Sequence, residues 1–178
     1  MNPSRSLLLL CCFALFSLGA AADVVEESAD PALDESADQV DRILVVKSER
    51  KMYLQSAGRT VRTFDISLGL VPEGAKQREG DFRTPEGVYH IEAKNERSDF
   101  FLALKVSYPN EHDRARARAS GVDPGGQIMI HGLPNSPKYT ESRYLGSDWT
   151  DGCIAVSNSD MVDLWLLTSV ATTIEIRP

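Results

Sequence analysis

Cysteine and histidine are scarce in this 178-residue chain, which contains only three of each. Cys11 and Cys12 lie in the apolar N-terminal stretch, so Cys153 is the only cysteine in the remainder. A single thiol cannot form a disulfide within that remainder, and the paired Cys or His spacings of structural zinc sites are absent. We therefore expect no disulfide framework, no bound metal and no cofactor.

Basic residues are also in the minority, with 19 Lys and Arg against 26 Asp and Glu and a net charge of -7. No basic face with interleaved aromatic residues is visible, so we expect no nucleic-acid partner. The long apolar run over residues 7–18 is too short to be a good transmembrane helix. The remaining composition is that of an ordinary globular protein, and the length suits one domain with a sizeable core.

The first 22 residues have the pattern of a secretory signal peptide. Arg5 supplies the positive charge, residues 7–18 form the apolar region, and Ala20-Ala21-Ala22 fits a cleavage site before Asp23. The alternative is an uncleaved anchor. The pattern predicts a periplasmic protein that has no stable membrane insertion after processing. In such an oxidising compartment an unpaired thiol is a liability unless it is buried or used.

Residues 23–41 read as an acidic leader, in which eight of the nineteen residues are Asp or Glu and none is Lys or Arg. This composition is typical of a solvated, flexible spacer, with a short helix as an option over residues 34–40. Residues 42–178 then form the folded domain.

Short apolar runs separated by turn residues dominate the domain and indicate a mostly β fold, closed or sandwiched, with few short helices. The expected strands cover residues 43–46, 51–55, 60–68, 88–91, 102–106, 128–130 and 172–176. Polar residues 110–119 and residues 157–168 are expected to be helical, the second helix being capped by Ser157. Residues 71–81 and 133–147 are expected to be irregular.

The sequence around Cys153 carries the chemistry. Small Gly152 precedes the cysteine, which leaves the backbone open for a carbonyl to approach the sulfur and nearby N–H groups together, as thiol acyl transfer requires. His131 ends a short apolar run and is the candidate base; an imidazole that takes the thiol proton lowers the effective thiol pKa. The alternatives are a buried inert thiol, a histidine with only a packing role, and a mixed zinc set with Asp148 and Asp151. His90 and His112 are assigned no role in catalysis.

Three blocks occur in one order: residues 80–89 (Gly-Asp-Phe-Arg-Thr-Pro-Glu-Gly-Val-Tyr), 130–132 (Ile-His-Gly) and 146–154. In the last block Gly146 is followed by three residues, then by Thr-Asp-Gly-Cys-Ile. Together these blocks resemble the L,D-transpeptidase catalytic domain, or YkuD, family, and the wider context is similar to its small YafK-type branch. The resemblance covers residues 43–176 and implies the β-sandwich or barrel fold of that family.

The resemblance implies an exported cysteine acyltransferase acting on peptidoglycan stem peptides. Cys153 attacks the carbonyl on the L-centre of the third stem residue and releases D-alanine, and His131 acts as base. A backbone carbonyl near Gly132 orients the base, and backbone N–H groups near Gly152 and Cys153 hold the oxyanion. The acceptor is a second stem peptide, giving 3-3 cross-links, or the lysine of an outer-membrane lipoprotein. If it is water, the protein is an L,D-endopeptidase, carboxypeptidase or amidase-type hydrolase. A non-catalytic wall-binding module on the same fold is a further alternative.

Two positions depart from the family pattern, since many members have histidine at Asp151 and arginine at Ala155. Substrate contacts are expected from five residues: Tyr139, Arg143, Trp149, Thr150 and Asp151. We also expect residues 133–147, which lie between base and nucleophile, to form a lid over the acyl-enzyme.

Overall fold

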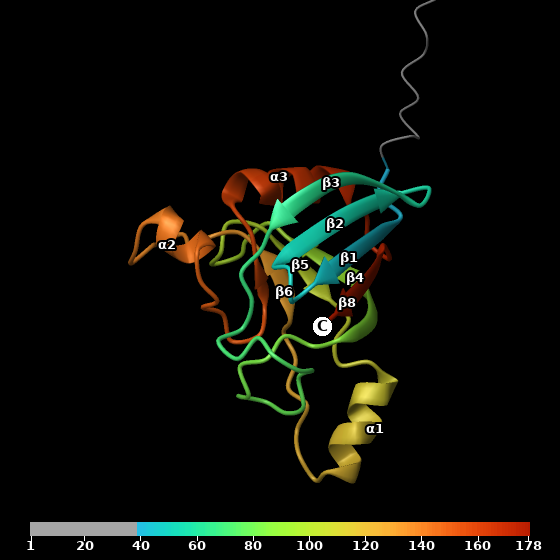
Figure 1. Ribbon diagram of the computed structural model, residues 1–178. Helices are drawn as coiled ribbons and strands as arrows, with labels where there is room; N and C mark the ends of the chain where they lie inside the picture. The colour runs from blue at the N-terminus through green and yellow to red at the C-terminus, as the bar shows by residue number, and fades with distance from the viewer. Residues whose placement is uncertain (1–38) are drawn as a thin grey trace, which may run out of the picture. The chain divides into compact units, whose positions relative to one another are not determined.

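The computed structural model describes residues 39–178. The predicted signal peptide, the leader up to residue 38 and most of its optional helix lie outside these residues. The strands are β1 (Arg42–Val46), β2 (Lys51–Ser56), β3 (Arg59–Asp65), β4 (Gly87–Asn95), β5 (Ala103–Val106), β6 (Met129–His131), β7 (Ile154–Ala155) and β8 (Thr173–Arg177). The helices are α1 (Glu111–Ala119), α2 (Glu141–Leu145) and α3 (Asn158–Leu167) (Figure 1). The mostly β prediction is therefore confirmed.

One curled sheet contains all eight strands in the order β3-β2-β1-β8-β4-β5-β6-β7. Parallel pairing joins β1 to β8 and β6 to β7, and the other neighbours are antiparallel. Beyond the end of β3, Ser67 forms an isolated bridge with Ala155 of β7, and two backbone hydrogen bonds of 2.8 Å join them. Because β3 and β7 are the two ends of the strand order, this bridge brings the sheet edges together.

The core lies on the inner face of this sheet. Alternate residues are buried along β1, β2 and β8, which is the period-two pattern of a half-buried strand. Helix α3 adds Met161 and Leu164 to the same apolar cluster, and in Figure 1 it runs beside β3. Each buried Leu or Met side chain stabilises the fold by roughly 1.5–3 kcal/mol relative to exposure.

The helix predictions are correct for α1 and α3, and their caps explain where they begin. Asn110 caps α1 through a capping box with Asp113, and Ser157 accepts the Asp160 N–H at 3.0 Å at the start of α3. The expectation of a wholly irregular segment over residues 133–147 is wrong, because α2 occupies residues 141–145. No helix among residues 39–178 is long and apolar enough to cross a membrane.

A long connection over residues 66–86 runs from β3 to β4 and packs against the segment that carries Cys153. Lys47, only 2% exposed, donates to the carbonyls of Gly74 and Thr84 and pairs with Glu86 at 2.8 Å. A second buried lysine, Lys76, pairs with Asp81 at 2.8 Å. These two ion pairs fix an otherwise irregular connection, because a buried ammonium is stable only with its partners in place.

Candidate active site

Parallel pairing of β6 with β7 brings the predicted base and nucleophile to one surface. His131 is in register with Ala155, and Cys153 lies two residues before Ala155 on the same strand line. Residues two apart on a strand point to the same face, so the side chains of His131 and Cys153 share a face of the sheet. This strand pairing brings together two residues, His131 and Cys153, that are separated by 21 residues in the sequence.

Both side chains line a cavity of about 370 Å³. Its walls come from the loop between β4 and β5, from the segment before β6, and from the segment before β7. The lining residues are Asn95, Arg97, Ser98, Asp99, Phe100, Gln127, Met129, His131, Trp149, Thr150, Asp151 and Cys153. No hydrogen bond joins Cys153 to His131 within the described residues; such contacts commonly tighten only when substrate binds.

The His131 ring is oriented by its own neighbour. Its Nδ1 lies 2.7 Å from the Gly132 carbonyl oxygen, so Nδ1 carries the proton and Nε2 is left as the basic nitrogen. The ring is 4% exposed and packs against Phe100 and Trp149, with ring centroids 4.6 and 5.7 Å away. Burial lowers the pKa of His131, although the contact with the Gly132 carbonyl opposes this effect. The imidazole is therefore neutral at pH 7 and able to accept a proton.

The surroundings of Cys153 do not produce the lowered thiol pKa that the sequence analysis expects from a neighbouring imidazole. Burial raises the pKa of the thiol and the Asp151 carboxylate raises it further, while a hydrogen bond from the Met129 N–H and the Lys76 ammonium lower it. The sulfur also lies 3.5 Å from the Gln127 carbonyl oxygen, an acceptor for S–H. The resting pair is thus a neutral thiol beside a neutral imidazole, because the cavity disfavours charge on both groups.

A network of short contacts holds the turn before the nucleophile. The Thr150 hydroxyl donates to the Cys153 carbonyl at 2.8 Å and accepts the Gly152 N–H at 3.2 Å. Gly152 has φ +129°, and a Cβ there would lie 2.6 Å from the Arg83 carbonyl oxygen, so only glycine fits.

These contacts change two of the predicted roles. The Thr150 side chain is 4% exposed and its hydroxyl is used within the turn, so it positions the backbone. The Gly152 and Gly132 N–H groups are occupied, by Thr150 Oγ1 and by the Leu102 carbonyl. That leaves the Cys153 N–H, which has no acceptor among the described residues, as the donor for an oxyanion.

Asp148 belongs to the scaffold rather than to a metal site. Its carboxylate accepts hydrogen bonds from Arg50 Nη2 and from the Leu68 N–H, both at 2.8 Å. Across residues 39–178, no group of three or more His, Cys, Asp or Glu side chains is arranged to hold a metal ion. The pairing of Asp148 with Arg50 instead fastens the segment before Trp149 to the turn between β1 and β2.

Residues 133–147 lie beside the cavity and contribute none of its lining residues. Tyr144 is 7% exposed, packs on Trp149 with centroids 5.0 Å apart, and accepts the Lys138 N–H at 3.1 Å. Tyr139 is half exposed, and the Arg143 guanidinium stacks on it at 4.0 Å. The expected lid over the acyl-enzyme is therefore not the arrangement in this structure, since Tyr144 anchors the segment to the side of the site.

Several cavity residues were missed by the sequence analysis, above all those of the loop between β4 and β5. Asn95, Arg97, Ser98 and Asp99 carry no motif, and their distance in sequence from Cys153 gives no signal. Pairing of β5 with both β4 and β6 brings this loop to the site. Arg97 is the one permanently cationic residue among the lining residues, and no hydrogen bond or ion pair of its guanidinium is present in the described part of the chain.

A scan against family models matches the L,D-transpeptidase catalytic domain, YkuD, over residues 40–176. The curled sheet and the placement of Cys153 and His131 at one cavity agree with that match, and the chain belongs to this family. A protein of Escherichia coli strain K12 whose name is "Putative L,D-transpeptidase YafK" is 39% identical over 61 residues, which is 33% of this chain and 23% of that protein.

Solved structures share the fold. The helical cell shape determining protein Pgp2 from Campylobacter jejuni superposes with a TM-score of 0.60 at 26% identity, over 77% of this chain and 47% of that one. Bd1075 from Bdellovibrio bacteriovorus has a TM-score of 0.55 at 23% identity, over 78% and 48%. An Enterococcus faecium L,D-transpeptidase C442S mutant has a TM-score of 0.52 at 15% identity, over 78% and 50%. The chain spans about half the length of these proteins and under a quarter of YafK.

Proposed function

We propose that this protein is a periplasmic cysteine acyltransferase that acts on peptidoglycan stem peptides through an acyl-enzyme at Cys153. The observation that carries the proposal is the meeting of the Cys153 thiol and the oriented His131 ring at one cavity. Membership of the L,D-transpeptidase family supplies the substrate class. Export rests on the N-terminal sequence pattern.

In the first step His131 Nε2 takes the thiol proton as the sulfur attacks the carbonyl on the L-centre of the third stem residue. The C–S bond forms, the C–N bond to D-alanine breaks, and the imidazolium returns its proton to the leaving amine. The Cys153 N–H donates to the oxyanion as it develops. Because burial favours the uncharged forms of both groups, the first step starts from a neutral thiol and a neutral imidazole.

In the second step an acceptor amine, in its uncharged form, attacks the thioester and a C–N bond forms. His131 Nε2 takes the proton from the attacking nitrogen and returns it to the sulfur as the C–S bond breaks, so the thiol is regenerated. The amine belongs to another stem peptide or to the lysine of an outer-membrane lipoprotein. Cationic amines are attracted by Asp99 and Asp151, which are exposed carboxylates at the cavity. We assign carboxylate recognition in the donor to Arg97, the one arginine among the residues that line the cavity.

Hydrolysis is the second candidate function. The observation that favours it is the position of residues 133–147, which lie beside the cavity and, like the rest of the described chain, do not cover it as a lid. An uncovered thioester is open to water, and the product is then a free carboxylate on the stem peptide. A purely wall-binding role has no use for the oriented imidazole beside a thiol.

Incubation of the purified mature protein with sacculi, followed by muropeptide analysis, tests the proposal. Cross-linked 3-3 dimers indicate transfer between stems, a tripeptide linked to lysine indicates protein attachment, and a free tripeptide indicates hydrolysis. Cys153→Ser is the control, and it should give none of these products. If wild type and Cys153→Ser give the same muropeptides, and a carbapenem adds no mass to the wild type, the protein is a binding module and our proposal is wrong.

A further inference from the structure

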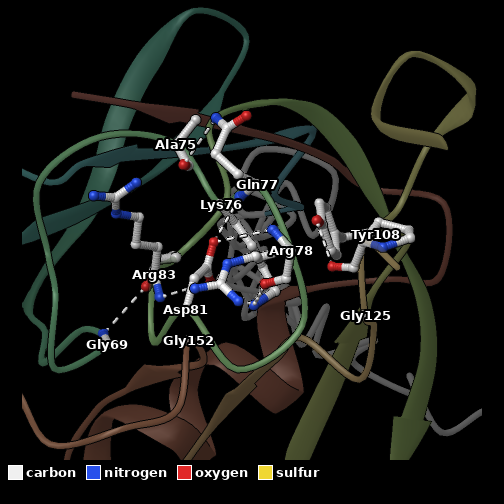
Figure 2. Close-up of polar contacts among 12 residues, drawn as sticks. Gly69, Ala75, Lys76, Gln77, Arg78, Asp81, Arg83, Tyr108, Gly125 and Gly152 are labelled. Atoms are coloured by element: carbon white, nitrogen blue, oxygen red, sulfur yellow. Dashed lines mark hydrogen bonds and ion pairs between the residues drawn. The ribbon is translucent and has the colours of Figure 1, made fainter. Parts of the chain in front are cut away.

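Lys76 and Asp81 form a buried ion pair that the acyl-transfer chemistry above does not use. Lys76 is 3% exposed, and its Nζ contacts Asp81 Oδ1 at 2.8 Å and the Arg78 carbonyl at 3.1 Å. A buried ammonium is rarely retained without a role, because removing it from water costs several kcal/mol. Figure 2 shows the pair enclosed by the 75–83 segment, with Gly152 beside it.

The Asp81 carboxylate organises the backbone around it. Oδ2 accepts the N–H groups of Gln77 and Arg78 at 2.7 and 3.1 Å, and Oδ1 accepts the Arg83 N–H at 3.2 Å. These hydrogen bonds and the Lys76 ammonium lower the pKa of Asp81 against the effect of its burial. The carboxylate is thus ionised and makes four hydrogen bonds, which fix the chain from residue 77 to residue 83.

That fixed segment packs directly on the nucleophile's turn. The Arg83 carbonyl faces Gly152 so closely that a Cβ there would lie 2.6 Å from its oxygen. The next residue, Thr84, is fully buried, accepts the Gly69 N–H at 3.2 Å and lies 3.5 Å from the Cys153 carbonyl oxygen. A displacement of residues 81–84 therefore moves the backbone that carries the thiol.

We propose that the Lys76–Asp81 ion pair is a positioning element for the nucleophile: it holds the 81–84 segment, and through it the Gly152–Cys153 turn, in place. The inference rests on the proposed role of Cys153 as nucleophile. It is supported by the effect of the Lys76 ammonium, which lowers the pKa of the Cys153 thiol while Asp151 raises it.

Other charged and titratable groups face the pair from neighbouring elements. From α1, Arg116 Nη2 donates to the Lys76 carbonyl at 3.1 Å and is itself paired with Asp113. Tyr108 and Asp123 complete the surroundings on that side, and Glu79 N donates to the Asp123 carbonyl at 2.8 Å. Arg116 thus supports the Lys76 backbone from the α1 side while its own charge is paired with Asp113.

The test compares Lys76→Gln with Lys47→Gln. Lys47 is a matched control because it is equally buried, is paired with a carboxylate and anchors the same connection through Gly74 and Thr84. The rate of Cys153 alkylation by iodoacetamide is measured from pH 6 to pH 10, with each variant held well below its melting temperature. We expect the Lys76→Gln profile to move to higher pH and the rate at pH 7.5 to fall severalfold, because the thiolate is the species that reacts. Lys76→Arg should restore the wild-type profile.

Lys47→Gln should lower the melting temperature without moving the alkylation profile. Equal shifts in the two glutamine variants would mean that any loosening of the connection suffices, and would overturn the proposal. An unmoved profile in Lys76→Gln would overturn it too. If Lys76→Gln does not fold, the alkylation profile is measured on the double variant Lys76→Gln/Asp81→Asn, which has no unpaired buried ion. A shift to higher pH then supports the proposal, and an unmoved profile overturns it. Because alkylation needs no peptidoglycan, a failure here is separate from a failure of the sacculus assay.

Discussion

At the scale of single residues, the site buries two groups that must be able to exchange a proton, His131 and Cys153. Phe100 and Trp149 enclose the His131 ring, and burial acts on both His131 and Cys153 in favour of the uncharged forms. A neutral thiol is less easily oxidised than a thiolate, so Cys153, the one cysteine among residues 39–178, is protected from oxidation at rest. Reactivity then depends on substrate bringing the two groups together.

The buried His131 predicts how stability depends on pH. Its pKa is lowered in the folded protein, whereas the unfolded chain binds a proton below about pH 6.5. The stabilisation is therefore present above about pH 6.5 and is lost as the pH falls below it. Between pH 7.5 and 5.5 we expect wild type to lose up to about 1.4 kcal/mol more unfolding free energy than His131→Gln. Denaturant unfolding at the two pH values measures this, and equal losses in the two proteins would refute the prediction. Asp81, whose pKa is lowered from 3.8, does not titrate in this window.

Arg97 predicts donor specificity. If its guanidinium binds a carboxylate of the stem peptide, Arg97→Ala should slow acylation of Cys153 by a defined tetrapeptide roughly tenfold to hundredfold, as expected for loss of a charged hydrogen bond. Alkylation by iodoacetamide should be unchanged. Arg143→Ala is the matched control, because Arg143 stacks on Tyr139 outside the cavity. Intact-protein mass spectrometry follows both reactions. If acylation is slower in Arg143→Ala than in Arg97→Ala, the prediction is wrong, and the donor carboxylate is bound by residues 133–147 instead.

At the scale of elements, the pairing of β6 with β7 positions the base, and the turn before β7 positions the nucleophile. Strand β7 has only two residues, Ile154 and Ala155, so its register cannot hold the turn alone. Support comes from the 66–86 connection on one side and from the hydrogen bonds of Thr150 on the other. The position of Cys153 thus depends on the irregular 66–86 connection, which the buried ion pairs of Lys47 and Lys76 hold in place.

Thr150→Val tests this support, since valine keeps the shape of threonine and removes the hydroxyl. The Gly152 N–H loses its acceptor and the Cys153 carbonyl loses its 2.8 Å donor. We expect a loss of about 1–3 kcal/mol in unfolding free energy and slower acylation by the tetrapeptide donor. Thr150→Ser, which retains the hydroxyl, should behave like wild type in both measurements. A Thr150→Val protein that is destabilised yet acylated at the wild-type rate would show that the turn does not need this network.

At the scale of the whole molecule, the folded domain presents the Cys153 thiol at a cavity, and the N-terminal sequence predicts that the protein is exported. We expect the protein recovered from the periplasm to begin at or near Asp23, because residues 20–22 fit a cleavage site. N-terminal sequencing or intact mass of the periplasmic form measures this. A form that retains residues 7–18 would contradict the prediction and would indicate an anchored protein.

The sequence by itself determined the fold class, because period-two burial in short apolar runs is a local property of strands. It also determined the family, since the three blocks and the Gly-Cys-Ile run are contiguous patterns. Cys153 and His131 followed from those patterns and from the scarcity of other thiols.

Only the tertiary structure decided what surrounds these two residues. Arg97 reaches the cavity through strand pairing over a long separation in sequence, and Lys76 becomes a buried cation only once its connection folds against the Gly152 turn. The segment at 133–147 was expected over the site because it joins base to nucleophile, yet burial of Tyr144 draws it to the side. Burial and neighbouring charges also decide that the pKa of His131 is lowered and the pKa of Cys153 is raised. Each pKa shift is the sum of the effects of neighbouring groups from several elements of the fold. A local pattern in the sequence cannot predict such a sum.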